Sequence, residues 1–150
     1  MIKRLLTHQL KGQAVRLEQD LMGMVTDLID TVSREKDVSP YGLSLLFKVT
    51  EDKLIGQVIT KESKELYCFH AGAMFTHLLE EQMKVAPAIL KNQIIKQLEG
   101  EQLEELLVSM LQKDCLLIRY NTSEQLEIYQ ITATNSELIN LQDFFENIEW

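Results

Sequence analysis

The residues best suited to chemistry lie together in the stretch LYCFHAGAMFTHLLEEQ, residues 66–82. Cysteine, histidine and glutamate are side chains that bind metal ions or act as nucleophiles and bases. If this stretch begins as a strand, Cys68 and His70 point to the same face, because side chains alternate along a strand. His77 follows seven residues later, about two turns into a helix. The candidate metal ligands are therefore Cys68, His70 and His77.

The spacing of these residues does not match a known type of zinc site. A structural zinc ion needs four ligands, and these usually come in pairs separated by short gaps. A Cys-x-His pair and one distant histidine leave the fourth ligand open among Glu80, Glu81 and Cys115. We therefore expect no metal and no cofactor.

Nucleophilic catalysis by a cysteine is not expected either. A reactive thiol needs a nearby base and a partly exposed, electropositive setting. Cys68 lies between two aromatic residues and Cys115 precedes two leucines, so burial should raise both thiol pKa values and make the groups inert. The chain also lacks a Gly-rich phosphate loop, Gly-x-Ser-x-Gly, His-Glu-x-x-His and Cys-x-x-Cys. We therefore predict no catalytic residues and a protein that is not an enzyme.

Composition and charge restrict the kinds of partner. Of the 150 residues, 45% are hydrophobic and 25% are charged, a balance typical of one globular domain over residues 1–150. The net charge of −8 disfavours nucleic acid, because the phosphate backbone dominates such binding. The longest apolar run is too short to span a membrane, and two cysteines in apolar runs favour a reducing compartment. We therefore expect a cytoplasmic protein that binds no nucleic acid and has no membrane span.

A helical pattern runs from Ile2 to about Ser33 and is longer than a compact domain of this size needs. Apolar residues recur in it every seven positions, in two interleaved rows that form a coiled-coil-like seam. Two interpretations are open: the helix binds a partner or a second copy of the chain, or it crosses its own sheet. The candidate partner-binding residues are Leu10, Leu17, Leu21, Met24 and Leu28.

The first half of the remaining chain predicts three strands. Residues 43–49, 54–60 and 66–70 are separated by polar turns and therefore predict an antiparallel meander. Gly56 lies in the middle of the second strand. It should mark either a bulge or a place where the first helix approaches closely.

The second half predicts further helices and a hairpin. These are a helix at 73–98, kinked or broken by Pro87, a helix at 101–113, and a hairpin of 115–121 with 125–132. Thr134 and Glu137 fit a capping box that opens a final helix. The predicted order is α-β-β-β-α-α-β-β-α, an α+β fold with an antiparallel sheet of about five strands and helices packed on it.

These features favour a non-enzymatic protein-interaction module that forms a homodimer. A groove between the 73–98 helix and the sheet would accept a segment of another protein, and the acidic body favours basic or amphipathic partners. Two alternatives belong to other classes. One is an acidic inhibitor or immunity-type protein that neutralises a basic enzyme. The other is a small enzyme or ligand sensor with a pocket near Cys68, His70 and His77.

The order of elements resembles that of the type III secretion chaperone-like fold, which runs helix, three strands, helix, two strands, helix. The matching stretches are 2–33, 43–70, 73–98, 115–132 and the closing helix from Ser136, and the helix at 101–113 is an addition to that plan. The resemblance is one of topology. It implies, as a further alternative, a chaperone-like protein that binds a secreted client.

Overall fold

The computed structural model describes residues 10–83 and 114–146, together with His8, Glu105, Val108, Ser109 and Leu111. The first segment contains helix α2 (Ala14–Lys36), the 3-10 turn η1 (Pro40–Gly42), strands β1 (Leu43–Thr50), β2 (Lys53–Thr60) and β3 (Glu65–His70), and helix α3 (Gly72–Met83). The second contains strands β4 (Cys115–Tyr120), β5 (Leu126–Ile131) and β6 (Ser136–Ile139), and helix α6 (Leu141–Glu146).

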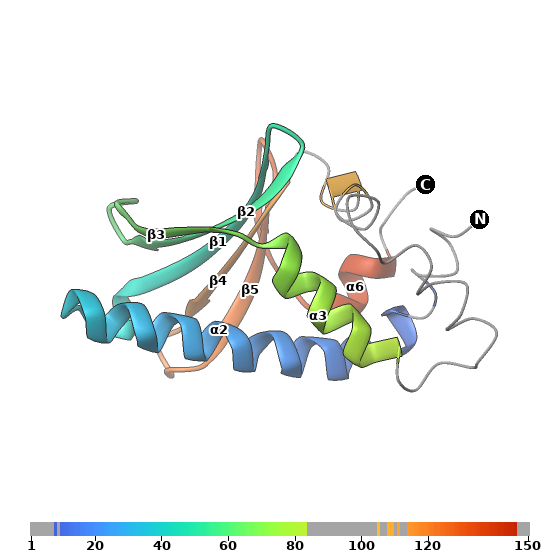
Figure 1. The fold of residues 1–150 in the computed structure, drawn as a ribbon, viewed down its shortest axis with the longest axis horizontal. Coiled ribbons are helices and arrows are strands. Elements are labelled where there is room, and N and C mark those ends of the chain that lie inside the picture. The colour runs from blue at the N-terminus through green and yellow to red at the C-terminus, as the bar shows by residue number, and fades with distance from the viewer. Residues whose placement is uncertain are drawn as a thin grey trace.

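Six strands form one antiparallel sheet in the order β3-β2-β1-β4-β5-β6. Strand β1 lies inside the sheet because it pairs with β2 along one edge and with β4 along the other. Helices α2, α3 and α6 pack on the same side of the sheet (Figure 1). The predicted α+β class is confirmed. Within the described part of the chain the order of elements is α-β-β-β-α-β-β-β-α, and the sheet there has one strand more than expected.

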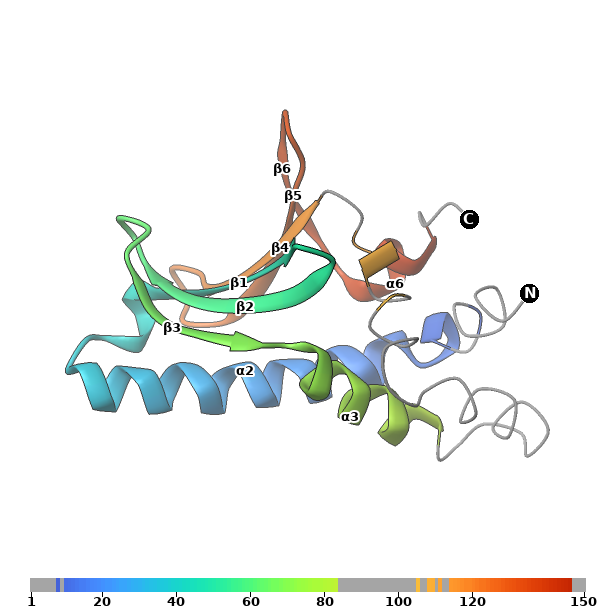
Figure 2. The ribbon, with the colours of Figure 1, turned by 45° about the horizontal axis from the view of Figure 1, so that its top comes forward.

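The apolar seam of the first helix packs into the core of its own chain. Figure 2 shows α2 running beneath the sheet. Its buried residues recur every three or four positions, as in any helix with one covered face. They are Ala14, Leu17, Leu21, Val25, Ile29 and Val32. The strands meet them with their inward side chains, among them Leu43, Leu45 and Phe47 of β1.

Three of the five predicted partner-binding residues are therefore covered by the protein itself. The side chains of Leu10, Leu17 and Leu21 are 0%, 4% and 1% exposed, so this conformation does not offer them to a partner. Met24 and Leu28 are half-buried and pack against the same core. The physical reason is that a seam of this kind fits a sheet as well as it fits another helix. Partner binding by this helix stays a prediction. In this conformation only the outward face of α2 is accessible to a partner.

Helix α2 is also shorter than the predicted helix from Ile2. It begins at Ala14, after Gln13 leaves the helical conformation (φ −112°, ψ 14°). Its 23 residues span about 35 Å. Of the predicted residues before Gln13, only His8 and residues 10–12 are described, and all of them are helical, so the predicted helix is interrupted at Gln13.

The end of the chain differs from the prediction. Residues 136–139 form strand β6 and pair with β5 instead of opening a helix. The helix begins only at α6, where the side-chain oxygen of Asn140 accepts a hydrogen bond from the third N–H of the helix (2.8 Å). Glu18 of α2 accepts one from the first N–H (2.9 Å). The predicted capping box of Thr134 and Glu137 is therefore wrong, because the residues that follow Thr134 form a strand. The N–H groups at the start of α6 bond to Asn140 and Glu18 instead.

Gly56 marks a close approach, but by a neighbouring strand and not by the first helix. Gly56 is paired with Phe69 of β3, and a Cβ atom added to Gly56 would lie 2.3 Å from the Phe69 ring. The aromatic ring thus fills the space that a side chain would occupy. The irregularity of β2 lies two residues further on, between Val58 and Ile59.

The other strand predictions are confirmed. Only parts of the other predicted helices lie within the described residues. The meander corresponds to β1, β2 and β3, and the hairpin to β4 and β5. Helix α3 matches the start of the predicted helix at 73–98, whereas 84–98 with Pro87 lie outside the described residues. In the predicted helix at 101–113, the four described residues are helical. No helix within the described part of the chain has the length and apolar character needed to cross a bilayer.

Candidate interaction surface

The sheet has a second face that none of the described helices covers. Because side chains alternate along a strand, each strand that sends one set of residues toward α2 sends another set to the opposite side. We call this opposite side the open face (Figure 2). The register of the strand pairs places on it Glu65, Cys68 and His70 of β3, Ile55, Gln57 and Ile59 of β2, Ser44, Leu46 and Lys48 of β1, Cys115, Leu117 and Arg119 of β4, Glu127, Tyr129 and Ile131 of β5, and Leu138 of β6.

A continuous apolar band crosses the open face. The register aligns Leu46 with Leu117, Leu117 with Tyr129, and Tyr129 with Leu138, in one row over four neighbouring strands. Two isoleucines of β2 and one of β5 flank this row. Leu138 is 61% exposed, and the other members are half-buried. Contiguous apolar surface of this kind is a mark of an interaction site, because covering it gains about 25 cal/mol per Å².

A polar cluster borders the apolar band on β4 and β5. The Arg119 guanidinium lies 4.7 Å from the centre of the Tyr129 ring. The Tyr129 hydroxyl donates to Glu127 Oε2 (2.6 Å), and the Asn121 amide donates to Glu127 Oε1 (2.5 Å). The hydrogen bonds from Asn121 and Tyr129, and then the charge of Arg119, lower the pKa of Glu127. The carboxylate of Glu127 is therefore held in its charged form by its neighbours, which is the opposite of what a general acid needs.

One end of the open face deepens into a groove of about 880 Å³. Ser44, Ile59 and Leu117 of the open face line it, so the groove continues the apolar band. At its rim Tyr41 and Tyr120 meet edge to face, with ring centres 5.0 Å apart. The charge of nearby Glu124, followed by partial burial, raises the pKa of Tyr41. The groove is wide and open to solvent, a shape suited to a polypeptide surface.

The sequence-predicted ligands Cys68, His70 and His77 do not come together. Cys68 and His70 lie on the open face of the edge strand β3, and both are exposed. His77 is exposed on α3, and α3 packs on the other side of the sheet, where Phe75 contacts Phe47. Among the described residues, no group of three or more His, Cys, Asp or Glu side chains is placed to hold a metal ion.

The two cysteines are free, and their surroundings differ from the expected full burial. Cys68 is exposed and Cys115 is half-buried. Desolvation, followed by the charge of Glu65, raises the pKa of the Cys68 thiol. Desolvation also raises the pKa of Cys115. Both thiols are therefore less nucleophilic at neutral pH than an ordinary cysteine, since the thiolate is the reactive form.

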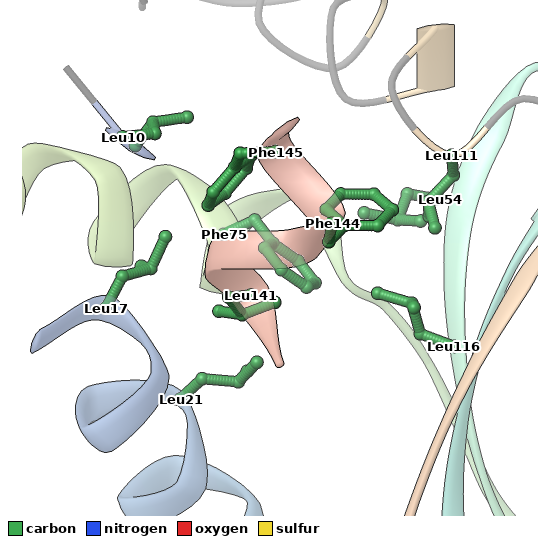
Figure 3. A pocket seen from close by; sticks show the side chains of 10 residues that line it. All are labelled: Leu10, Leu17, Leu21, Leu54, Phe75, Leu111, Leu116, Leu141, Phe144 and Phe145. Atoms are coloured by element: carbon green, nitrogen blue, oxygen red, sulfur yellow. The ribbon is translucent and has the colours of Figure 1, made fainter. Parts of the chain in front are cut away.

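A cavity of about 40 Å³ lies on the covered side of the sheet, between the helices and the strands (Figure 3). Its lining is entirely apolar and comes from α2, α3, α6, the inward side of β2 and β4, and two leucines outside these elements. The ten lining residues are Leu10, Leu17, Leu21, Leu54, Phe75, Leu111, Leu116, Leu141, Phe144 and Phe145. Such a lining offers no group for catalysis. The cavity is a packing gap near the place where a groove beside the 73–98 helix is predicted.

The comparisons with known proteins do not add a family. No protein-family model matches the chain, and no significant match is found among curated proteins or solved structures. The resemblance to the type III secretion chaperone-like fold therefore stays a prediction from element order.

The open face was not predicted from the sequence, although the pattern of apolar residues in the strands indicates it. Residues 43–49, 54–60 and 115–120 contain apolar residues at both alternating phases, so Leu46, Ile55 and Leu117 are apolar as well as their inward neighbours. A strand with one solvated face normally shows a clean alternation. Apolar residues at both phases indicate that the second face is also to be covered.

Proposed function

We propose that the protein is a non-enzymatic protein-binding module of the cytoplasm and that it binds its partner with the open face of the sheet. The observation that carries this proposal is the apolar band of Leu46, Leu117, Tyr129 and Leu138, which no described element covers. The two free cysteines support a reducing compartment.

The energetics of the open face support binding in preference to permanent exposure. Covering an aliphatic side chain completely gains about 1.5–3 kcal/mol. The band offers several such side chains in one row, and the neighbouring groove extends the same surface around Tyr41 and Tyr120. A flat apolar centre with a polar rim is the usual composition of a protein interface.

The chemistry of the face supports binding in preference to catalysis. Glu127, the one carboxylate of the cluster with a shifted pKa, is held ionised by hydrogen bonds. Both thiols have raised pKa values, and His77 lies across the sheet from His70. A nucleophile or general base at pH 7 would need the opposite shifts. A secretion chaperone or an acidic inhibitor would also bind protein, so both remain variants of the proposed function.

Affinity capture from the native host tests the proposal. The bait is the full chain as wild type, as Leu117→Glu in the apolar band, and as Val15→Glu on the outer side of α2. Val15 is 65% exposed on the covered side of the sheet, so it controls for the addition of a charge. We expect proteins that are retained by the wild type and by Val15→Glu but lost with Leu117→Glu. Equal retention by all three baits would show that the open face is not the binding surface.

A further inference from the structure

We propose that the partner which covers the open face is a second copy of this chain, packed sheet against sheet. This inference rests on the proposed function, because it names the occupant of the same surface. Three properties of the face support it: its size, its charge and the way its polar groups are satisfied.

The open face has about the size that a specific interface needs. Six strands about 4.8 Å apart, each with about six residues at about 3.4 Å, give a face of roughly 24 Å by 20 Å. Two copies together would bury roughly 1,000 Å², which is about the lower bound for a biological interface. Sheets that pack face to face do so over side chains of this kind, about 10 Å apart.

The open face is neutral in an acidic protein. Its charged residues are Lys48 and Arg119 against Glu65 and Glu127, so their charges cancel, whereas the whole chain carries −8. Two copies therefore repel each other over most of their surfaces and least where the open faces meet. A strongly basic partner finds no excess of acid on this face, so the charge pattern favours a second copy over such a partner.

Several polar groups of the face already have partners within the chain, which lowers the cost of covering them. Glu127 accepts from Asn121 and Tyr129, and Arg119 lies over the Tyr129 ring. Gln57 donates to Glu65 (2.8 Å) across the β2–β3 pair. A buried polar group is costly mainly when it is left unpaired. These pairs can therefore enter an interface intact.

Sedimentation equilibrium of the full chain tests the proposal over a range centred on about 50 µM, where weak homodimers become populated. The wild type and Val15→Glu should approach about 35 kDa, twice the 17.4 kDa of one chain. Leu117→Glu and Leu138→Glu should remain monomeric, with dimerisation weakened at least about tenfold for each buried charge. Leu138 is so exposed that Leu138→Glu keeps the test valid if Leu117→Glu fails to fold.

Cysteine labelling adds a local readout. Cys115 lies on the open face and should be alkylated more slowly as the wild-type concentration rises, but at a constant rate in Leu138→Glu. A wild type that stays monomeric overturns this inference, and so does a dimer that both open-face variants preserve. If the wild type is monomeric while Leu117→Glu still loses its captured proteins, another protein covers the face and the proposed function stands. If neither effect is seen, both proposals fail.

Discussion

Gly56 and Phe69 illustrate how a pair of residues determines local packing. The Phe69 ring stands where a Gly56 side chain would be, and it also meets Phe47 edge to face at 6.5 Å. We predict that Gly56→Ala destabilises the protein by about 1–3 kcal/mol, because the ring must move out of a packed site. Urea unfolding measures the change.

A second glycine provides the matched control. Gly23 lies in the middle of α2, and nothing within 4 Å would meet an added Cβ atom. Gly23→Ala should therefore stabilise the protein by up to about 1 kcal/mol through helix propensity. The double variant Gly56→Ala, Phe69→Leu should recover part of the loss. Equal effects at both glycines would contradict the packing explanation.

Glu127 predicts a dependence of stability on pH. Hydrogen bonds from Asn121 and Tyr129 lower its pKa in the folded state. The stabilisation is therefore fully present above the unfolded value of about 4.3 and is lost as the pH falls through the lower folded value. Wild type should be more stable than Glu127→Gln at pH 7, and the difference should shrink in acid. Urea titrations at neutral and acidic pH measure it, and a constant difference would contradict the role of the charge.

At the scale of elements, the helices are arranged by contacts between distant segments. Helix α6 has only six residues, too few to be stable alone, and it is held by packing and by two side-chain caps. One cap, Asn140, precedes it directly, while the other, Glu18, comes from α2. Helix α6 therefore depends on α2 for one of its caps.

The caps lead to a prediction for the end of the chain. Asn140→Ala should cost about 1 kcal/mol, because it leaves an N–H group at the start of α6 without its acceptor. Thr134→Ala should change stability by less than about 0.5 kcal/mol, since Thr134 is exposed in the β5–β6 turn. Thermal unfolding compares the two variants. A larger loss of stability for Thr134→Ala than for Asn140→Ala would instead support the capping box predicted from the sequence.

At the scale of the whole molecule, the two faces of the sheet differ in what covers them. One face is closed by α2, α3 and α6, and the other carries an apolar band with a neutral set of charges. The acidity of the chain therefore resides away from the proposed interface. This separation is what makes self-association through the open face compatible with a net charge of −8.

Salt should accordingly strengthen self-association. The mutual repulsion of two acidic copies is long-ranged and is screened as the Debye length falls from about 10 Å at 0.1 M salt to about 3 Å at 1 M. We predict that the dissociation constant of the dimer decreases as sodium chloride is raised over this range. Sedimentation at several salt concentrations measures the trend. A dimer that dissociates in salt would instead be held by ion pairs and not by the apolar band.

Much of the fold follows from local patterns. Alternation in 43–49 and 54–60 and polar turns between them predict hairpins, because register and turn chemistry are properties of neighbouring residues. Residues 136–139 are the exception: the local pattern of Thr134 and Glu137 predicts the start of a helix, but the segment pairs with β5 as a strand. The site was the harder part, since Cys68, His70 and His77 are close in sequence but divided between the two sides of the sheet.

By itself, then, the sequence determined the α+β class, the meander of β1, β2 and β3, the hairpin of β4 and β5, and the amphipathic character of the first helix. Only the tertiary structure decided that this helix covers its own sheet and that the opposite face of the sheet is left without a described helix. The physical reason is that hydrophobic burial has no direction of its own. An apolar stripe specifies that it must be covered, and only the arrangement of all the elements specifies what covers it.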